Sequence, residues 1–130
     1  MSARVGYELA LLRRQWPDLE YLAADHWVRL PPQPVPSGWS HDAAEICFRI
    51  PADVATQPYG FYVKPILLLA SNGTLRTPTN YTSPATTPFD GEWAMFSWSP
   101  LTWRPHAEVA RGDNMVHFVR SFRDRLELYE

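Results

Sequence analysis

The sequence predicts an α+β fold in which two terminal helices pack on an antiparallel sheet. The segments at both ends repeat apolar residues with the 3.6-residue period of a helix, whereas the middle alternates with the two-residue period of a strand. The expected strands follow one another without helices between them, an order typical of an antiparallel meander. A chain of 130 residues is long enough for one core, so a single domain over residues 1–130 is expected.

The first helix is predicted at the N-terminus. Its apolar stripe recurs at steps of four, three and four residues and consists of Val5, Leu9, Leu12 and Trp16. Pro17 ends it, because proline disfavours helical geometry in the preceding residue. Residues Leu19–Leu30 indicate one or two strands. The proline-rich stretch Pro31–Trp39 is expected to be a loop or a sheet edge, since proline cannot donate a ladder hydrogen bond.

The clearest strand is Ala44–Ile50, in which apolar residues alternate with Glu45, Cys47 and Arg49. The apolar run Ile66–Ala70 predicts a short buried strand, closed by a turn at Ser71–Gly73. Thr74–Pro88 carries prolines and threonines without a buried period. It is expected to be a long, irregular and exposed segment beside the motif that follows it.

The last helix is predicted after Gly112. Asp113 is the expected N-cap, because a carboxylate there can accept a bond from a free backbone N–H. One face of the helix is apolar and consists of Met115, Phe118, Val119, Phe122 and Leu126. His117 lies off this face and is expected on the surface.

Charge and composition exclude several classes of protein. Twelve basic residues against fourteen acidic ones give a net charge of −2, so neither a nucleic-acid partner nor a membrane partner is expected. A single cysteine excludes an internal disulfide and favours a reducing compartment. The N-terminus does not resemble a signal peptide, and the longest apolar run is far short of the roughly 20 residues of a membrane span. A cytoplasmic location is therefore expected.

No cofactor or metal site is predicted. The four histidines show no pair at ligand spacing, Cys47 has no cysteine partner, and the six glycines form no phosphate-binding loop. Cys47 is an attractive nucleophile by chemistry alone. Its position in the middle of a strand, between Ile46 and Phe48, instead favours a structural role.

The densest motif is the proline-tryptophan segment, FSWSPLTWRPHAE (Phe96–Glu108). One interpretation is catalytic, with Ser97 as nucleophile, His106 as general base and Asp113 orienting the base. The other is structural. In it the tryptophans Trp98 and Trp103 fill the core while prolines shape a corner. The serine is not in a G-x-S-x-G elbow, which argues against an ordinary serine hydrolase.

The order of these elements resembles the ubiquitin-conjugating (UBC) fold and, more closely, the prokaryotic ubiquitin-conjugating-like family E. The resemblance spans nearly the whole chain. It rests on the motifs Gln15-Trp16-Pro17-Asp18, Phe48-Arg49-Ile50-Pro51, Pro58-Tyr59-Gly60, Phe96-Ser97, Trp103-Arg104-Pro105 and Gly112-Asp113.

This resemblance implies a bacterial protein that accepts a ubiquitin-like protein from an adenylating activating enzyme and transfers it to a target. In the superfamily a cysteine lies several residues ahead of a W-S-P motif. Here Ser97 precedes Trp103-Arg104-Pro105 by six residues, and the region contains no cysteine. The superfamily's His-Pro-Asn tripeptide is also missing, and Asn80, seventeen residues before Ser97, is a weak substitute for its asparagine.

Three interpretations stay open. In the first, Ser97 carries the ubiquitin-like tail as an oxyester, with His106 and Asp113 activating its hydroxyl. In the second, the site is inactive and the domain is an adaptor that binds a ubiquitin-like protein or an activating enzyme. In the third, the chain is an unrelated module whose aromatic residues grip proline-rich peptides.

Overall fold

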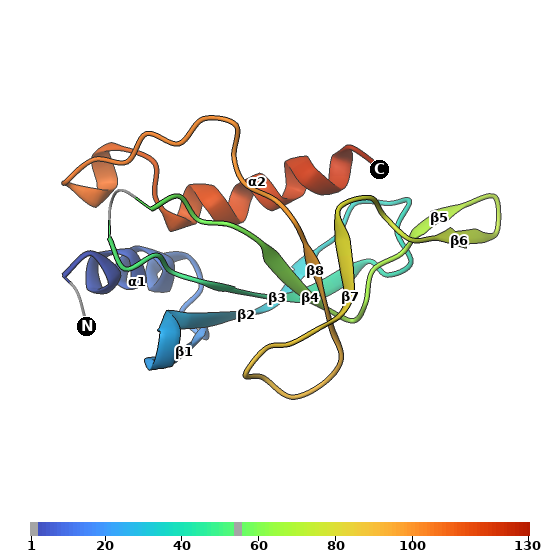
Figure 1. The fold of residues 1–130 in the computed structure, drawn as a ribbon, viewed down its shortest axis with the longest axis horizontal. Coiled ribbons are helices and arrows are strands. Elements are labelled where there is room, and N and C mark those ends of the chain that lie inside the picture. The colour runs from blue at the N-terminus through green and yellow to red at the C-terminus, as the bar shows by residue number, and fades with distance from the viewer. Residues whose placement is uncertain (1–2, 54–55) are drawn as a thin grey trace.

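The computed structural model describes residues 3–53 and 56–130 (Figure 1). Helices α1 (Ala3–Gln15) and α2 (Met115–Glu127) stand at the two ends of the described chain. The elements between them are β1 (Glu20–Leu22), the 3-10 turn η1 (Ala24–His26), β2 (Trp27–Pro34), β3 (Ala43–Arg49), β4 (Phe61–Lys64), β5 (Leu69–Ser71), β6 (Thr74–Arg76), β7 (Tyr81–Ala85), β8 (Trp93–Phe96) and the 3-10 turn η2 (Val109–Arg111).

Six strands form one antiparallel sheet in the order β1-β2-β3-β4-β8-β7. Strands β5 and β6 form a separate hairpin that projects from one end of the molecule (Figure 1). The α+β class with an N-terminal helix, an antiparallel sheet and a C-terminal helix is therefore confirmed. The predicted turn at Ser71–Gly73 is also present, since Asn72 and Gly73 join β5 to β6 with positive φ angles of 51° and 77°.

Both helices pack on the same face of the sheet, and their predicted apolar stripes form one core with it. In α1 the residues Val5, Leu9 and Leu12 are buried, while Trp16 is half-buried against the same core. The predicted stripe of α2 is buried throughout. Phe118 stacks on Phe61 of β4 with ring centroids 4.3 Å apart. Burial of a large apolar side chain stabilises a fold by about 1.5–3 kcal/mol, so this shared face holds the two helices on the sheet.

The opposite face of the sheet has a second, smaller core that the sequence did not predict. Its buried members are Cys47, Phe89 and Trp93. The connection from β7 to β8 supplies Phe89, and it lies across the sheet from α2 (Figure 1). Glu45 pairs with Arg29 and with Lys64 at the edge of this cluster. Burial alone would raise the pKa of Glu45, but hydrogen bonds from these two cations outweigh it and lower that pKa.

Two proline-containing segments form strands, and only one of them contradicts its prediction. Strand β2 continues through Pro34, where it pairs with β3 but not with β1 and shifts register between Leu30 and Gln33, so its prolines lie at a sheet edge, one of the two predicted outcomes. The segment Thr74–Pro88 is exposed as predicted, but it is not irregular, because it contains β6 and β7. Strand β7 forms an edge of the sheet, where proline is tolerated. Its side chains are exposed or half-buried, so it carries no buried period.

The predicted N-cap of α2 is wrong by one residue. Asn114, not Asp113, has the extended backbone of a cap, and its Oδ1 accepts bonds from the N–H groups of Val116 at 3.1 Å and His117 at 3.2 Å. The apolar run Ile66–Ala70 is likewise only partly a strand. It enters β5 at Leu69, although Leu67 is fully buried.

Candidate functional site

The proline-tryptophan segment begins at the end of β8 and is bonded along its first residues to two neighbouring segments. The N–H of Ser97 donates to the carbonyl of Asn80 at 2.8 Å, and the N–H of Gly60 donates to the carbonyl of Trp98 at 2.8 Å. The hydroxyl of Ser99 donates to the carbonyl of Pro58 at 3.1 Å. The Pro58-Tyr59-Gly60 motif therefore lies directly beside Phe96-Ser97 and the residues that follow it.

The two tryptophans of the segment pack against the core, as the structural interpretation predicted. The indole N–H of Trp98 donates to the hydroxyl of Ser121 on α2 at 3.0 Å. Trp103 lines a small void of about 10 Å³ with Glu8 and Met115, which has room for about one water molecule. The tryptophans thus attach the segment to both helices.

The segment then turns at the Trp103-Arg104-Pro105 motif, which is clamped to Gly112-Asp113. The N–H of Asp113 donates to the carbonyl of Arg104 at 2.9 Å, and the N–H of Arg104 donates to Oδ2 of Asp113 at 2.7 Å. A Cβ atom on Gly112 would lie 2.6 Å from both the carbonyl oxygen of Arg104 and the backbone nitrogen of His106. Only glycine allows this close approach of the two backbones.

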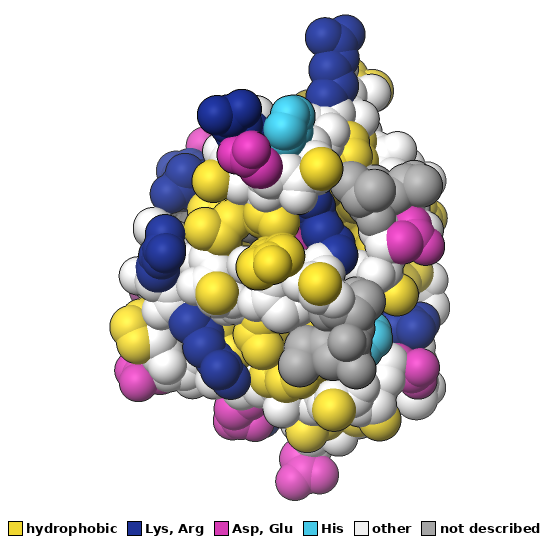
Figure 2. Space-filling model, turned by 90° about the vertical axis from the view of Figure 1, so that its left-hand side faces the viewer, with side chains coloured by type: hydrophobic (Ala, Val, Ile, Leu, Met, Phe, Trp, Pro, Cys, Tyr) yellow, Lys and Arg dark blue, Asp and Glu magenta, His cyan; other side chains and the backbone are white. Residues whose placement is uncertain are grey.

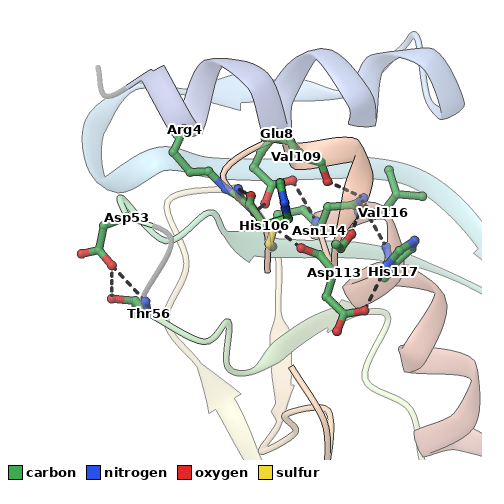
Figure 3. Close-up of polar contacts among 12 residues, drawn as sticks. Arg4, Glu8, Asp53, Thr56, His106, Val109, Asp113, Asn114, Val116 and His117 are labelled. Carbon is green, nitrogen blue, oxygen red and sulfur yellow. Dashed lines mark hydrogen bonds and ion pairs between the residues drawn. The ribbon is translucent and has the colours of Figure 1, made fainter. Parts of the chain in front are cut away.

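An ion pair on α1 fixes this corner from the other side (Figure 3). Arg4 donates to the carbonyl of His106 at 2.6 Å and pairs with Glu8 at 3.2 Å. Glu8 is only 3% exposed and accepts a bond from the N–H of Met115 at 3.0 Å, the first residue of α2. Burial raises the pKa of Glu8, against the lowering effects of the Met115 N–H and of Arg4.

The structure does not bring the three predicted catalytic residues together. Ser97 lies half-buried at the end of β8, and within residues 3–53 and 56–130 no hydrogen bond joins its hydroxyl to His106. Asp113 binds the N–H of Arg104 and contacts Nδ1 of His117 at 3.2 Å, so it orients His117 instead of His106.

The hydrogen bond of His106 also limits its chemistry. Its Nδ1 accepts a bond from the N–H of Glu108 at 2.9 Å. A neutral imidazole that accepts at Nδ1 carries its proton on Nε2, so neither nitrogen is left with a lone pair for the proton of a serine. In this arrangement His106 holds the backbone of the corner through its Nδ1.

Cys47 has the inert surroundings that its strand position predicted. The side chain is completely buried between Phe89 and Trp93. Burial raises the pKa of its thiol to about 12, so the reactive thiolate is almost absent at neutral pH.

The sequence did not point to Arg4 and Glu8 as part of this region, nor to the contact that Asn80 makes there. The spacing of Arg4 and Glu8, four residues apart on a predicted helix, indicates an ion pair, but not its contact with the distant corner. Asn80 lies seventeen residues before Ser97, yet the pairing of β7 with β8 brings the two together. Only the assembled sheet reveals that contact.

Comparison of the chain with protein-family models, with curated proteins and with solved structures finds no match. Across the part of the chain that the structure describes, no helix is long and apolar enough to cross a membrane.

Proposed function

We propose that the chain is a UBC-like domain of a ubiquitin-like conjugation pathway and acts as an adaptor, binding a ubiquitin-like protein or its activating enzyme. Two features support the UBC assignment. One is the order of the elements along the chain, in which one helix precedes the strands of an antiparallel sheet and another follows them. The other is that motifs distant in the sequence meet as pairs: Pro58-Tyr59-Gly60 lies against Phe96-Ser97, and Trp103-Arg104-Pro105 lies against Gly112-Asp113.

The observation that favours an adaptor is the hydrogen bond between Nδ1 of His106 and the N–H of Glu108. A serine hydroxyl is almost never ionised at neutral pH and needs a base to become a nucleophile. The predicted base is occupied, and the carboxylate predicted to orient it is bound to Arg104 and His117. Binding needs no such base, so the arrangement suits an adaptor.

The end of the molecule that carries the corner offers apolar side chains to a partner. Leu101 is fully exposed and Tyr59 is 63% exposed, and the side-chain amide of Gln57 ties their two segments together by a bond to the carbonyl of Pro100. Figure 2 shows that hydrophobic side chains gather in the middle of this end, with basic side chains among and around them. Neighbouring exposed apolar residues are typical of protein-binding surfaces.

Calorimetric titration with the cognate ubiquitin-like protein and with its activating enzyme tests the proposal. We expect binding to one of them that is unchanged by Ser97→Ala. Leu101→Asp should weaken it by about tenfold or more, equivalent to about 1.4 kcal/mol. Leu128→Asp is the matched control, because Leu128 is an exposed leucine outside this end of the chain's fold, just after α2. Absence of binding to both proteins, or equal losses in the two variants, would overturn the proposal.

A second candidate function is acyl transfer through Ser97 as an oxyester. The contact of Ser97 with Asn80 favours it, because it places an asparagine beside the candidate nucleophile as the superfamily's tripeptide does. Asn80 has a positive φ of 51°, an uncommon conformation that this backbone contact helps to hold. Transfer through Ser97 then requires a base other than His106.

A further inference from the structure

A cleft of about 450 Å³ lies between η1 and the connection that follows β3. We call it the η1 cleft, and the polar side chains that line it include Asp25, His26, Arg49, Gln57 and Tyr59. Its volume falls within the range of sites for small molecules. None of the predicted catalytic residues lines it, although Gln57 and Tyr59 border both this cleft and the apolar surface of the adaptor proposal.

The backbone at η1 is held in an uncommon conformation that brings a histidine to this cleft. Asp25 and His26 have φ angles of 60° and 57°, in the left-handed region that residues other than glycine seldom adopt. Three bonds stabilise them. Ile50 donates its N–H to the carbonyl of His26 at 2.9 Å, Arg49 donates Nε to the carbonyl of Asp25 at 3.2 Å, and the Tyr21 hydroxyl bonds Nδ1 of His26 at 2.9 Å.

These bonds leave polar groups at the cleft that can contact a ligand. The Tyr21 contact occupies Nδ1 of His26, and among the described residues Nε2 has no hydrogen-bond partner. Nε of Arg49 is occupied, and its Nη2 forms an ion pair with Oδ1 of Asp25 at 3.6 Å, longer than a hydrogen bond. The hydroxyl of the exposed Tyr59 likewise has no hydrogen-bond partner in the described residues. The cleft is therefore lined by a guanidinium that is ion-paired with Asp25 and lies over the Trp27 ring, by the unbonded Nε2 of an imidazole, and by an exposed phenol.

We propose that the η1 cleft binds an oxyanion, a carboxylate or a phosphate group of a small molecule or peptide terminus, with Arg49 as its principal contact. A guanidinium presents parallel N–H donors that match the oxygens of such groups. The prolines Pro51 and Pro58 on the cleft wall provide apolar contact for the rest of the ligand. Asp25 opposes an anion, but its side chain is 74% exposed, so solvent screens much of its charge. The inference does not depend on the ubiquitin-like partner.

Nuclear magnetic resonance titrations at constant ionic strength test the proposal. The probes are inorganic phosphate, acetylglycylglycine with its free carboxylate, and acetylglycylglycinamide, which lacks that charge. We expect saturable shifts of the Arg49 side-chain and His26 ring signals with phosphate, with the free carboxylate or with both, and none with the amide. The probe that binds more tightly identifies the source of the oxyanion.

Three variants distinguish anion binding at the η1 cleft from a nonspecific effect of the protein's charge. Arg49→Gln should weaken binding by about tenfold or more, because it removes the charge and the paired donors. Asp25→Asn should tighten it by about two- to fivefold, because it removes the opposing charge while asparagine tolerates a positive φ. Arg123→Gln is the matched control, since it removes an exposed arginine that pairs with Glu127 on α2, and it should leave affinity unchanged.

The proposal is overturned if neither anion saturates the shifts or if the amide binds as tightly as the carboxylate. It is also overturned if Arg49→Gln behaves like Arg123→Gln. If Arg49→Gln fails to fold, Asp25→Asn decides the matter, and unchanged or weaker anion binding by that variant contradicts the proposal.

Discussion

At the scale of single residues, Glu8 has the greatest influence on the candidate site. Its two carboxylate oxygens join α1 to the start of α2 and to Arg4, which in turn holds the carbonyl of His106. Glu8→Ala leaves the Met115 N–H and the Arg4 charge without this partner, so we expect a loss of about 3 kcal/mol in the free energy of unfolding. Glu8→Gln keeps an acceptor of the same shape and should stay within about 1 kcal/mol of the parent protein. Urea denaturation measures both.

The pH dependence of stability provides a second check on Glu8. Burial raises its pKa above the ordinary value of 4.5, so the folded state binds more protons than the unfolded state between these two pKa values. The contribution of Glu8 is therefore fully present below pH 4.5 and is lost as the pH rises through the folded-state pKa. Relative to Glu8→Gln, the parent protein should lose stability as the pH rises over this window. If the stability of the parent protein relative to Glu8→Gln stays constant or increases as the pH rises, the raised pKa is contradicted.

Cys47 supplies a probe of the second core. Because the thiol is buried and its pKa is raised to about 12, we expect a disulfide reagent such as dithionitrobenzoate to label it only after unfolding. The labelling rate in mild urea should then follow the unfolding equilibrium. Rapid, complete labelling of the native protein would show that the thiol is accessible and would reopen its role as a nucleophile.

At the scale of elements, the corner depends on the absence of a side chain at Gly112. A Cβ there would meet the backbone of Arg104 and His106 at 2.6 Å, so Gly112→Ala should destabilise the protein by about 1–3 kcal/mol. Gly6→Ala is the matched control, since among the described residues a Cβ at that position meets no heavy atom within 4 Å apart from its chain neighbours and the backbone of α1. It should stabilise the helix by about 0.5–1 kcal/mol. Thermal unfolding measures both variants: we expect a lower unfolding temperature for Gly112→Ala and a higher one for Gly6→Ala. Equal shifts of the two unfolding temperatures would refute this account.

The sequence predicted those elements whose burial follows a regular period. The two helices and β3 each bury one face against the shared core, so spacing alone revealed them. Strands β6 and β7 are exposed or half-buried along their whole length, so they carry no buried period and become strands only by pairing with a neighbour. The same limit applies to β2, whose register shift lets prolines remain in a strand.

Candidate site residues were harder to predict than elements, because long-range contacts decide them. The sequence placed His106 and Asp113 seven residues apart and suggested a pair. In the structure Asp113 instead accepts a hydrogen bond from the N–H of Arg104, next to Gly112. It also contacts His117, which lies four residues later in the sequence. Asn80 reaches Ser97 only through the pairing of β7 with β8, which no local pattern could indicate.

At the scale of the whole molecule, the two helices, the sheet and the proline-tryptophan segment act as one support for a fixed corner. Arg4 and Glu8 bind the corner from α1, while Trp98 binds the start of the segment to α2 and the Pro58-Tyr59-Gly60 motif lies beside it. A segment held along its length by such contacts suits a preformed binding surface, because little conformational entropy is lost when a partner docks. This rigidity is the physical basis of the adaptor proposal.

The central claim is tested most directly by intact-protein mass spectrometry after incubation with the cognate ubiquitin-like protein, its activating enzyme and ATP. The adaptor proposal predicts a noncovalent complex, no adduct on this chain, and identical behaviour of Ser97→Ala. An adduct that survives thiol reductant, is cleaved by hydroxylamine and disappears in Ser97→Ala but not in Ser99→Ala would contradict it. That result would establish Ser97 as an oxyester-forming nucleophile.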